Sequence, residues 1–342
     1  MSSTATLSPQ EMRAAALCTA LATATTVMVL EFFRIPNCYM SLTLAVTLSV
    51  LPRPTLSHVI ARVVALSLGI LTSMGVLIAF FQAPWLSLPL AASIPALGYA
   101  FFLKRFGPGS AYAFGAYFLA FYIMSNLSLK ESDFVLQALK LWIQSIIPIV
   151  LTYLAAMLTK QIKPTAAYAK IDLAGIVSIA LTVSIAIMLD IAIKTDRAAR
   201  LVMASISTIT FLEIGKSVNL YLQQMIGYFC GAIVATAFIV GVVALGNDIS
   251  LYLLALGGLF GLLEWLGCYF SNHTTFFRGI ISMCSFSVLM IPTPDRTFHV
   301  AYGRITTSLL GFFTAIFVYL IIQEFRKLTE RLMTPARLEA EG

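Results

Sequence analysis

Charged residues are scarce in this sequence. Only 11% of its 342 residues are Asp, Glu, Lys or Arg, whereas 59% are hydrophobic. A soluble domain carries charge on about a quarter of its residues, which keeps its surface in water. The composition therefore excludes an ordinary soluble globule, and it predicts an all-α polytopic membrane protein whose solvent is the lipid bilayer.

Short catalytic and nucleotide-binding motifs are also missing. The chain contains no HExxH, GxSxG or P-loop sequence and no GxGxxG in a strand-turn-helix context. We therefore expect a protein that is not an enzyme and has no cofactor. Without a P-loop the chain does not hydrolyse ATP, so a transporter of this kind takes its energy from an ion or solute gradient or from another chain.

Two further absences exclude other classes of site and partner. The five cysteines form no CxxC pair and have no metal-ligand spacing, so we expect no metal site. The net charge is +7, but the basic residues are scattered along the chain and make no basic stripe with interleaved aromatics. Nucleic acid is therefore not an expected partner.

Long apolar runs between charges and Pro or Gly residues predict about twelve transmembrane helices. Two of these runs, 39–52 and 198–213, are short for a full crossing, so each is expected to be tilted, broken or partly re-entrant. The predicted spans are 13–33, 39–52, 59–82, 85–103, 108–126, 135–159, 171–193, 198–213, 218–245, 251–270, 276–292 and 299–323.

The distribution of Lys and Arg predicts the orientation. With both chain ends in the cytoplasm, most of the 22 basic residues fall on the inner side, and the opposite orientation would invert this bias. Residues 1–12, 161–170 and 324–342 are then cytoplasmic segments.

A weak internal duplication relates the two halves of the chain. Shifting the sequence by about 160 residues aligns Glu31 with Asp190 and Gly69 with Gly231. Each half contains six predicted spans, and an even number preserves orientation. We therefore expect two six-helix parallel repeats, 13–160 and 171–323, related by an axis along the membrane normal.

One short motif recurs within these spans: a polar residue, a small residue three positions later and a glycine four positions after that. Two helical turns separate its ends, so all three positions share one face of the helix. Small residues on that face allow a neighbouring helix to approach closely. The three copies are Arg62, Ala65 and Gly69; Gln224, Gly227 and Gly231; and Arg304, Thr307 and Gly311.

This motif, repeated within six-span halves, resembles the membrane domain of the fusaric acid resistance and aromatic acid exporter family. The resemblance implies export of aromatic carboxylic acids and related weak acids across a bacterial inner membrane, beside a periplasmic membrane-fusion protein. Many members of that family carry a large cytosolic domain between or after the halves. Here only residues 161–170 link the halves, so this is a compact form.

Two acidic residues at matching points of the halves are candidates for proton coupling. A carboxylate in a partly dry site has a raised pKa, so Glu31 and Asp190 would load and release protons near neutral pH. Each is followed within about one turn by a base, Arg34 or Lys194. The alternative is that each acid forms an ion pair with that base at the outer interface.

Two other acids are candidates for the same role. Glu264 lies deep in apolar sequence within the tenth span, and its alternative is a salt bridge to Arg278. Glu213 lies at the inner end of the short eighth span, where it either lines a broken-helix cavity or caps the loop with Lys216.

An anionic substrate needs fixed positive charge. Arg62 and Arg304 are the leading candidates because both begin a copy of the motif, and Lys140 and Arg200 follow them. The alternative for Arg62 is anchoring at the inner surface by the positive-inside rule. For the other three it is snorkelling to the membrane interface.

These observations predict a proton-coupled exporter of aromatic or other hydrophobic weak organic acids. A passive organic-anion channel and a membrane scaffold or lipid-handling component are the alternatives from other classes. The expected partners are a small organic acid, membrane lipid and a periplasmic membrane-fusion protein, and a second copy of the chain remains an open alternative.

Overall fold

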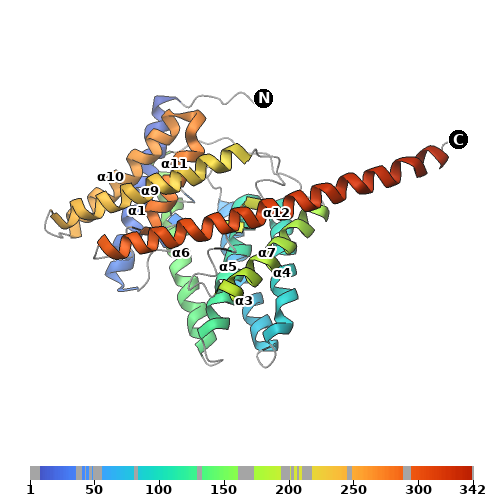
Figure 1. Cartoon of the computed structure of the whole chain (residues 1–342). Coiled ribbons are helices and arrows are strands. Elements are labelled where there is room, and N and C mark those ends of the chain that lie inside the picture. The colour runs from blue at the N-terminus through green and yellow to red at the C-terminus, as the bar shows by residue number, and fades with distance from the viewer. Residues whose placement is uncertain are drawn as a thin grey trace.

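A computed structural model of the chain is helical, and its described part contains no strand (Figure 1). The structure describes residues 8–35, 41–42, 44–45, 48, 56–80, 84–128, 133–160, 173–193, 201, 204–205, 208–209, 218–244, 249–287 and 294–340. Its helices, with 3-10 turns written as η, are α1 (Pro9–Phe32), α3 (Leu56–Ala79), η1 (Pro84–Ser87), α4 (Leu88–Phe106), α5 (Pro108–Ser128), α6 (Phe134–Leu158), α7 (Leu173–Ile193), α9 (Val218–Ala244), α10 (Ile249–Tyr269), η3 (Ser271–His273), α11 (Thr274–Ser287) and α12 (Pro294–Ala340).

Six of the described helices are long and apolar enough to cross a bilayer. They are α1, α3, α6 and α10, together with Leu222–Val242 of α9 and Ile305–Lys327 of α12. The chain is thus a helical membrane protein, as its composition predicts. The full set of twelve spans stays a prediction.

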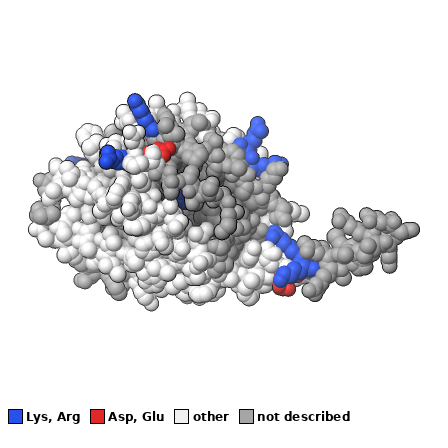
Figure 2. Space-filling view, turned by 90° about the horizontal axis from the view of Figure 1, so that it is seen from above, with Lys and Arg blue, Asp and Glu red and all other residues white. Residues whose placement is uncertain are grey.

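Helix α3 illustrates how these helices face their surroundings. One side, which includes Ala65 and Ile70, is buried against other helices, whereas Ile60, Val64 and Leu71 on the other side are exposed. A water-facing helix would carry polar residues on that outer side, so apolar residues there indicate contact with lipid. Figure 2 agrees, because most of the described surface on the face that it shows carries no charged side chain.

The two short predicted spans are described only at single positions, and each of those positions is helical. In the first they are Ser41, Leu42, Leu44, Ala45 and Leu48. In the second they are Leu201, Ala204, Ser205, Thr208 and Ile209. All of them except the half-buried Ala204 are buried in the protein.

Two helix pairs pack with their backbones in close contact. A Cβ atom built on Gly69 of α3 would lie 2.5 Å from the carbonyl oxygen of Phe114 on α5. A Cβ atom built on Gly227 of α9 would lie 2.1 Å from the carbonyl oxygen of Phe276 on α11. Side chains do not fit at these distances, so glycine is required for each helix pair to form.

The third copy of the motif makes a similar contact on α12. A Cβ atom on Gly311 would lie 2.8 Å from the carbonyl oxygen of Leu201 and 2.9 Å from the nitrogen of Ser205. The predicted close approach at the motif glycines is therefore confirmed in all three copies.

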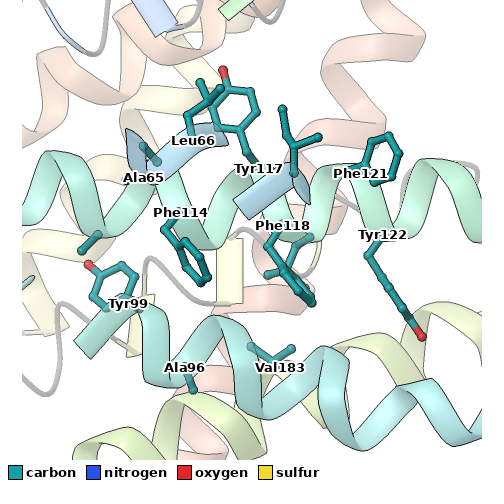
Figure 3. Packing of buried hydrophobic residues seen from close by; sticks show 14 of the residues in the cluster. Ala65, Leu66, Ala96, Tyr99, Phe114, Tyr117, Phe118, Phe121, Tyr122 and Val183 are labelled. Carbon is teal, nitrogen blue, oxygen red and sulfur yellow. The ribbon is translucent and has the colours of Figure 1, made fainter. Parts of the chain in front are cut away.

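Two hydrophobic clusters form the larger part of the described core. The first lies among α3, α4, α5 and α6 and includes Val183 of α7, which is fully buried (Figure 3). Rings of Phe114 and Phe118 on α5 stack 6.4 Å apart inside it. The second cluster lies among α9, α10 and α11 and includes Val27 of α1 and Leu42. Helix α1 therefore packs with the last third of the chain, and α7 packs with its first half.

Helix α12 is the longest described element. It contains 47 residues, which corresponds to about 70 Å at 1.5 Å per residue and exceeds the bilayer core of roughly 30 Å. Its C-terminal part extends beyond the other helices (Figure 1). The predicted tail 324–342 is thus a continuation of the last helix through Ala340.

Candidate functional site

The four predicted proton-coupling residues have different surroundings. Glu213 lies outside the described residues, and Asp190 lies on α7 with a side chain that the structure does not describe. Glu31 is exposed near the end of α1. Glu264 on α10 is buried, with 6% of its surface exposed. Of the two acids whose side chains are described, only Glu264 is held inside the protein.

The four predicted substrate-binding residues also differ in whether their side chains are described, exposed or buried. Arg200 lies outside the described residues, and the side chain of Arg304 on α12 is not described. Lys140 on α6 is exposed. Arg62 on α3 is 7% exposed and shares the buried side of that helix with Gly69. The structure thus places one buried base, Arg62, and one buried acid, Glu264, in helices that can cross a membrane.

Neither of the ion pairs considered for the described acids is present among the described side chains. Arg34 forms no ion pair with Glu31. Its backbone has a left-handed φ of 50°, two residues after α1 ends. Arg278 on α11 is exposed and is not paired with Glu264. Burial of Glu264 therefore has a cause other than a salt bridge to Arg278.

The Arg62 guanidinium lies against the start of α5. A Cβ atom built on Gly109 would lie 2.6 Å from Nε and 2.8 Å from Nη2 of Arg62. A larger residue at position 109 would clash with the guanidinium, so glycine is needed for Arg62 to lie there. Because Gly69 holds the α3 and α5 backbones together two turns further along, the register of the two helices is fixed and so is the position of Arg62 relative to α5.

Helix α5 starts without a capping side chain. Gly107 occupies the N-cap position with φ 89° and accepts the first helical hydrogen bond from the Ala111 N–H at 3.2 Å. It has no side chain that could cap the helix, and the first turn contains no acidic residue. Ser110 is 1% exposed, and its hydroxyl has no hydrogen-bond partner among the described residues. A buried hydroxyl and the Arg62 guanidinium therefore both lie near the start of α5, the end to which the first N–H groups of the helix point.

Glu264 lies on the side of α10 that faces α1. Two glycines that precede it on α10 lie close to α1. A Cβ atom on Gly257, seven residues earlier, would lie 3.2 Å from the carbonyl oxygen of Ala20. A Cβ atom on Gly261, three residues earlier, would lie 3.1 Å from the carbonyl oxygen of Ala16. Residues at this spacing share one helix face, so Glu264 continues the same side. The carboxylate accepts a weak hydrogen bond from a thiol one turn later, since Cys268 Sγ lies 3.7 Å from Oε1.

Buried hydroxyls form a second polar feature, and α1 and α7 carry them in matching positions. Thr23 donates to the carbonyl oxygen of Thr19 at 2.8 Å, and Thr182 donates to that of Ser178 at 2.7 Å. All four residues are fully buried. The hydroxyls of Thr19 and Thr26 have no partner in the described part of the chain, so these positions can accept a hydrogen bond from water or a solute.

Sequence reasoning missed the small residues that shape this site. Gly109 and Ser110 fall inside the predicted span 108–126 and have no predicted role, although the run from Gly107 to Ser110 carries a usable signal. A glycine N-cap followed by proline at N1 marks a helix start without a capping side chain. The buried threonines of α1 lie within the apolar run of the first predicted span, so the sequence pattern does not set them apart.

Among the described residues, no group of three or more His, Cys, Asp and Glu side chains could hold a metal ion. The described chemistry of the site is therefore that of an arginine, a carboxylate, backbone amides and hydroxyls. Compared with known protein families, curated proteins and solved structures, the chain has no significant match, so the resemblance to aromatic acid exporters stays a prediction from the motif.

Proposed function

We propose that the chain is an inner-membrane secondary transporter that exports aromatic or other hydrophobic weak organic acids in exchange for protons. The observation that carries the proposal is the burial of Arg62 and Glu264 within two apolar helices. An ionisable group inside a membrane costs several kcal/mol unless it is compensated, so such groups mark solute or proton pathways. Arg62 is always charged and suits a substrate carboxylate, whereas Glu264 titrates and suits a proton.

We further propose that twelve helices form two six-helix repeats, and the pattern of helix contacts supports this. The pairs α1 with α6, α3 with α5, α3 with α6 and α4 with α5 each have a counterpart six helices later. Those counterparts are α7 with α12, α9 with α11, α9 with α12 and α10 with α11. A duplicated ancestral unit accounts for every one of these matches.

Buried side chains support the same repeat. Thr19 and Thr23 of α1 correspond to Ser178 and Thr182 of α7 at the offset that aligns Glu31 with Asp190. The position of the unpartnered Thr26 is apolar in α7. The halves therefore share a polar stripe but differ in detail, which is expected if one half has specialised.

Contacts between the halves suggest how the repeats work together. Helix α1 packs on α10, and α7 packs on α4, so the first helix of each half packs against the other half as well as its own. Rocking of one repeat against the other would therefore shift α10 relative to α1, and Glu264 lies at that contact. Such a movement can change the exposure of Glu264 to water, which links its protonation to the state of the transporter.

Both buried groups lie near helix ends that the predicted orientation places on the cytoplasmic side. Arg62 follows the start of α3 by six residues, and Glu264 precedes the end of α10 by five. At 1.5 Å per residue each is roughly 8 to 9 Å from its helix end. A substrate entering from the cytoplasm would meet Arg62 early, as export requires. A periplasmic membrane-fusion protein is the proposed partner on the other side.

Proteoliposomes provide the test. Purified protein is reconstituted, and the movement of 4-hydroxybenzoate is followed with and without an imposed pH gradient, with protein-free liposomes measuring diffusion of the neutral acid. We expect uphill accumulation that depends on the gradient and is lost in Arg62→Gln. Movement that only follows the anion's own gradient, with single-channel currents in planar bilayers, would identify a channel. Absence of protein-dependent movement for a broad set of aromatic carboxylates would reject transport of this class.

A further inference from the structure

Two threonine hydroxyls on α1 are buried without a hydrogen bond. Thr19 and Thr26 are fully buried, and neither hydroxyl bonds to any residue that the structure describes. A threonine in a helix can donate to a carbonyl oxygen of the preceding turn. On the same helix Thr23 donates in this way to Thr19 at 2.8 Å, and Thr25 donates to Leu21 at 2.6 Å. Thr19 and Thr26 do not, so both hydroxyls are available to a group from outside the helix.

The packing of α1 shows two sides on which it contacts other helices. Ala20 lies on the side that faces α10, where its carbonyl oxygen would be 3.2 Å from a Cβ atom on Gly257. Ala22 lies on the side that faces α6, in a cluster with Ala155 and Ala156. Successive residues of a helix are turned by about 100°, so Ala20 and Ala22 lie roughly 160° apart around α1. The two contacts are therefore on nearly opposite sides.

The buried threonines occupy the sector between these two contacts. At the same rotation per residue, Thr19, Thr23 and Thr26 lie about 60° to 120° from Ala20, in the direction of Ala22. All three are fully buried, so this sector faces the protein interior. The threonine face of α1, defined by these three residues, is thus directed between α10 and α6.

The unsatisfied hydroxyls raise the free energy of the state that the structure describes. A hydroxyl that is sealed from water without a hydrogen bond loses the bonds that water would give it. A transporter alternates between states in which its helices separate and close. A state in which water or a solute reaches the threonine face restores those bonds, and this offsets part of the apolar contact that opening removes.

From this arrangement we propose that the threonine face of α1 lines the path of the transported acid and is closed in this structure. The inference rests on the proposed function and names side chains along the path. A threonine hydroxyl both donates and accepts but carries no charge. It therefore suits neutral hydroxyl groups, which come from water in the open path or from the phenol or protonated carboxyl group of the solute.

The direction of this face fits the proposed proton site. Cβ positions on Gly257 and Gly261 lie near the carbonyl oxygens of Ala20 and Ala16, so α1 and α10 run antiparallel. Glu264 follows Gly261 by three residues and is therefore level with the part of α1 that precedes Ala16. A solute that moves along the threonine face toward the start of α1 would approach the level of this carboxylate.

Helix α7 provides an internal comparison. Ser178 and Thr182 hold the matching buried positions, but Ser178 donates to the carbonyl oxygen of Ala174 at 2.9 Å and Thr182 donates to that of Ser178 at 2.7 Å. The position that matches Thr26 is Ile185. Both matching hydroxyls of α7 are satisfied by their own helix, so the proposed path belongs to α1.

Thiol labelling of the full chain in proteoliposomes tests the path. Thr19→Cys and Thr26→Cys are made singly in a cysteine-free background and treated with 2-aminoethyl methanethiosulfonate, which reacts with the thiolate and so requires water. The matched control retains Cys18 as its only cysteine, because Cys18 is equally buried on α1 but packs toward α6. Met28→Cys is the lipid-facing control and Ser178→Cys the control on α7.

We expect both threonine positions to react at least about tenfold faster than the controls, since each unit of pKa rise in a dry site lowers the thiolate fraction tenfold. Saturating 4-hydroxybenzoate should slow the reaction at both. Rates as slow as that of Cys18 would show dry packing and overturn the path. Equally fast labelling of Cys18 would show that α1 loosens as a whole, which overturns the assignment to the threonine face. Fast labelling that 4-hydroxybenzoate does not slow overturns the assignment to the solute.

Valine variants give a readout that needs no added cysteine. Thr19→Val and Thr26→Val keep the side-chain shape and remove a hydroxyl that is unsatisfied in the closed state, so they should raise the thermal midpoint. Favouring the closed state should also slow exchange of labelled for unlabelled 4-hydroxybenzoate by about fivefold or more. Thr25→Val is the control with unchanged exchange, because its hydroxyl already bonds to Leu21. A raised midpoint with unchanged exchange in both variants would make the two hydroxyls structural and overturn the path.

The labelling experiment separates this inference from the proposed function. Labelling and its protection by 4-hydroxybenzoate require no pH gradient and no net movement. If the threonine positions stay unreactive while gradient-driven transport is present, the path fails and the proposed function stands. If they react and are protected but no transport occurs, the proposed function fails and the threonine face remains a hydrated binding surface.

Discussion

Gly69 of α3 lies against the backbone of Phe114 on α5, so that a Cβ atom on this glycine would be 2.5 Å from the Phe114 carbonyl oxygen. A backbone atom cannot move aside as the end of a side chain can. The contact therefore fixes the distance between two helices, and with it the position of Arg62 about two turns earlier on α3.

Gly69→Ala should destabilise the protein by about 1–3 kcal/mol, because the added methyl group forces α3 and α5 apart. Gly75→Ala on the same helix is the control, since a Cβ atom there would meet nothing within 4 Å. Both variants make the same change in helix propensity. Thermal unfolding in detergent, followed by intrinsic fluorescence, should show a lower midpoint for Gly69→Ala only. Equal midpoints would mean that the two helices are not packed as described.

The packing of α1 on α10 can be tested by a disulfide. Cβ positions at Ala24 and Gly257 are 3.4 Å apart, close to the roughly 3.5–4.5 Å that a disulfide requires. In a background without the five native cysteines, Ala24→Cys with Gly257→Cys should oxidise readily. A protease site inserted between residues 161 and 172 would show the product as a single band after cleavage under non-reducing conditions.

The neighbouring pair Ala24→Cys with Gly258→Cys serves as control for that experiment, because a Cβ atom on Gly258 meets nothing within 4 Å. Two bands for both pairs would refute the packing of α1 on α10. One band for both pairs would indicate that α1 and α10 are too mobile for their register to be defined.

Part of this architecture could be predicted from sequence because it depends on local pattern. Scarce charge determined the membrane class, and the spacing of Arg62, Ala65 and Gly69 predicted a face that packs closely. The partner of that face was not predictable, since small residues permit close approach without specifying which helix approaches. Packing of α1 on α10 is an example: the alanines and glycines involved would suit many partners.

The same limit applies to the candidate site. Arg62 and Lys140 are both single bases near the start of an apolar run, yet the first is buried and the second exposed. The difference arises from the tertiary fold, because the Arg62 side of α3 meets α5 whereas Lys140 lies on an exposed part of α6. Sequence could therefore propose both residues as ligands and could not choose between them.

Orientation in the membrane gives a prediction about chemical access. Lys104 and Lys327 are exposed and belong to the predicted cytoplasmic side, whereas Arg34 is exposed and belongs to the predicted outer side. Single cysteines at these positions in a cysteine-free protein should react with a membrane-impermeant maleimide accordingly. We expect labelling of Lys104→Cys and Lys327→Cys only in inside-out vesicles and of Arg34→Cys only in intact cells with a permeabilised outer membrane. The reverse pattern would invert the topology and place the proposed loading site outside.

Glu264→Gln tests proton coupling at the buried carboxylate. Glutamine has nearly the same volume, and its carbonyl oxygen can still accept from the Cys268 thiol, so the packing of α10 on α1 should survive with a midpoint change below about 5 °C. Because the amide cannot take up a proton near neutral pH, the variant should bind 4-hydroxybenzoate as before but lose accumulation driven by a pH gradient. Downhill exchange of labelled for unlabelled substrate is the control, since it needs binding and movement but no net proton transfer.

Glu31→Gln separates this hypothesis from the paired-acid hypothesis for Glu31 and Asp190. Glu31 is exposed near the end of α1, so its replacement should leave folding unchanged. If Glu264→Gln abolishes gradient-driven accumulation and Glu31→Gln retains it, the proton is carried at the contact between α1 and α10. The opposite result would assign coupling to the repeated acids and leave Glu264 a structural residue. Retention of coupling in both variants would exclude both carboxylates and direct attention to Asp190 and Glu213, each tested as the corresponding amide.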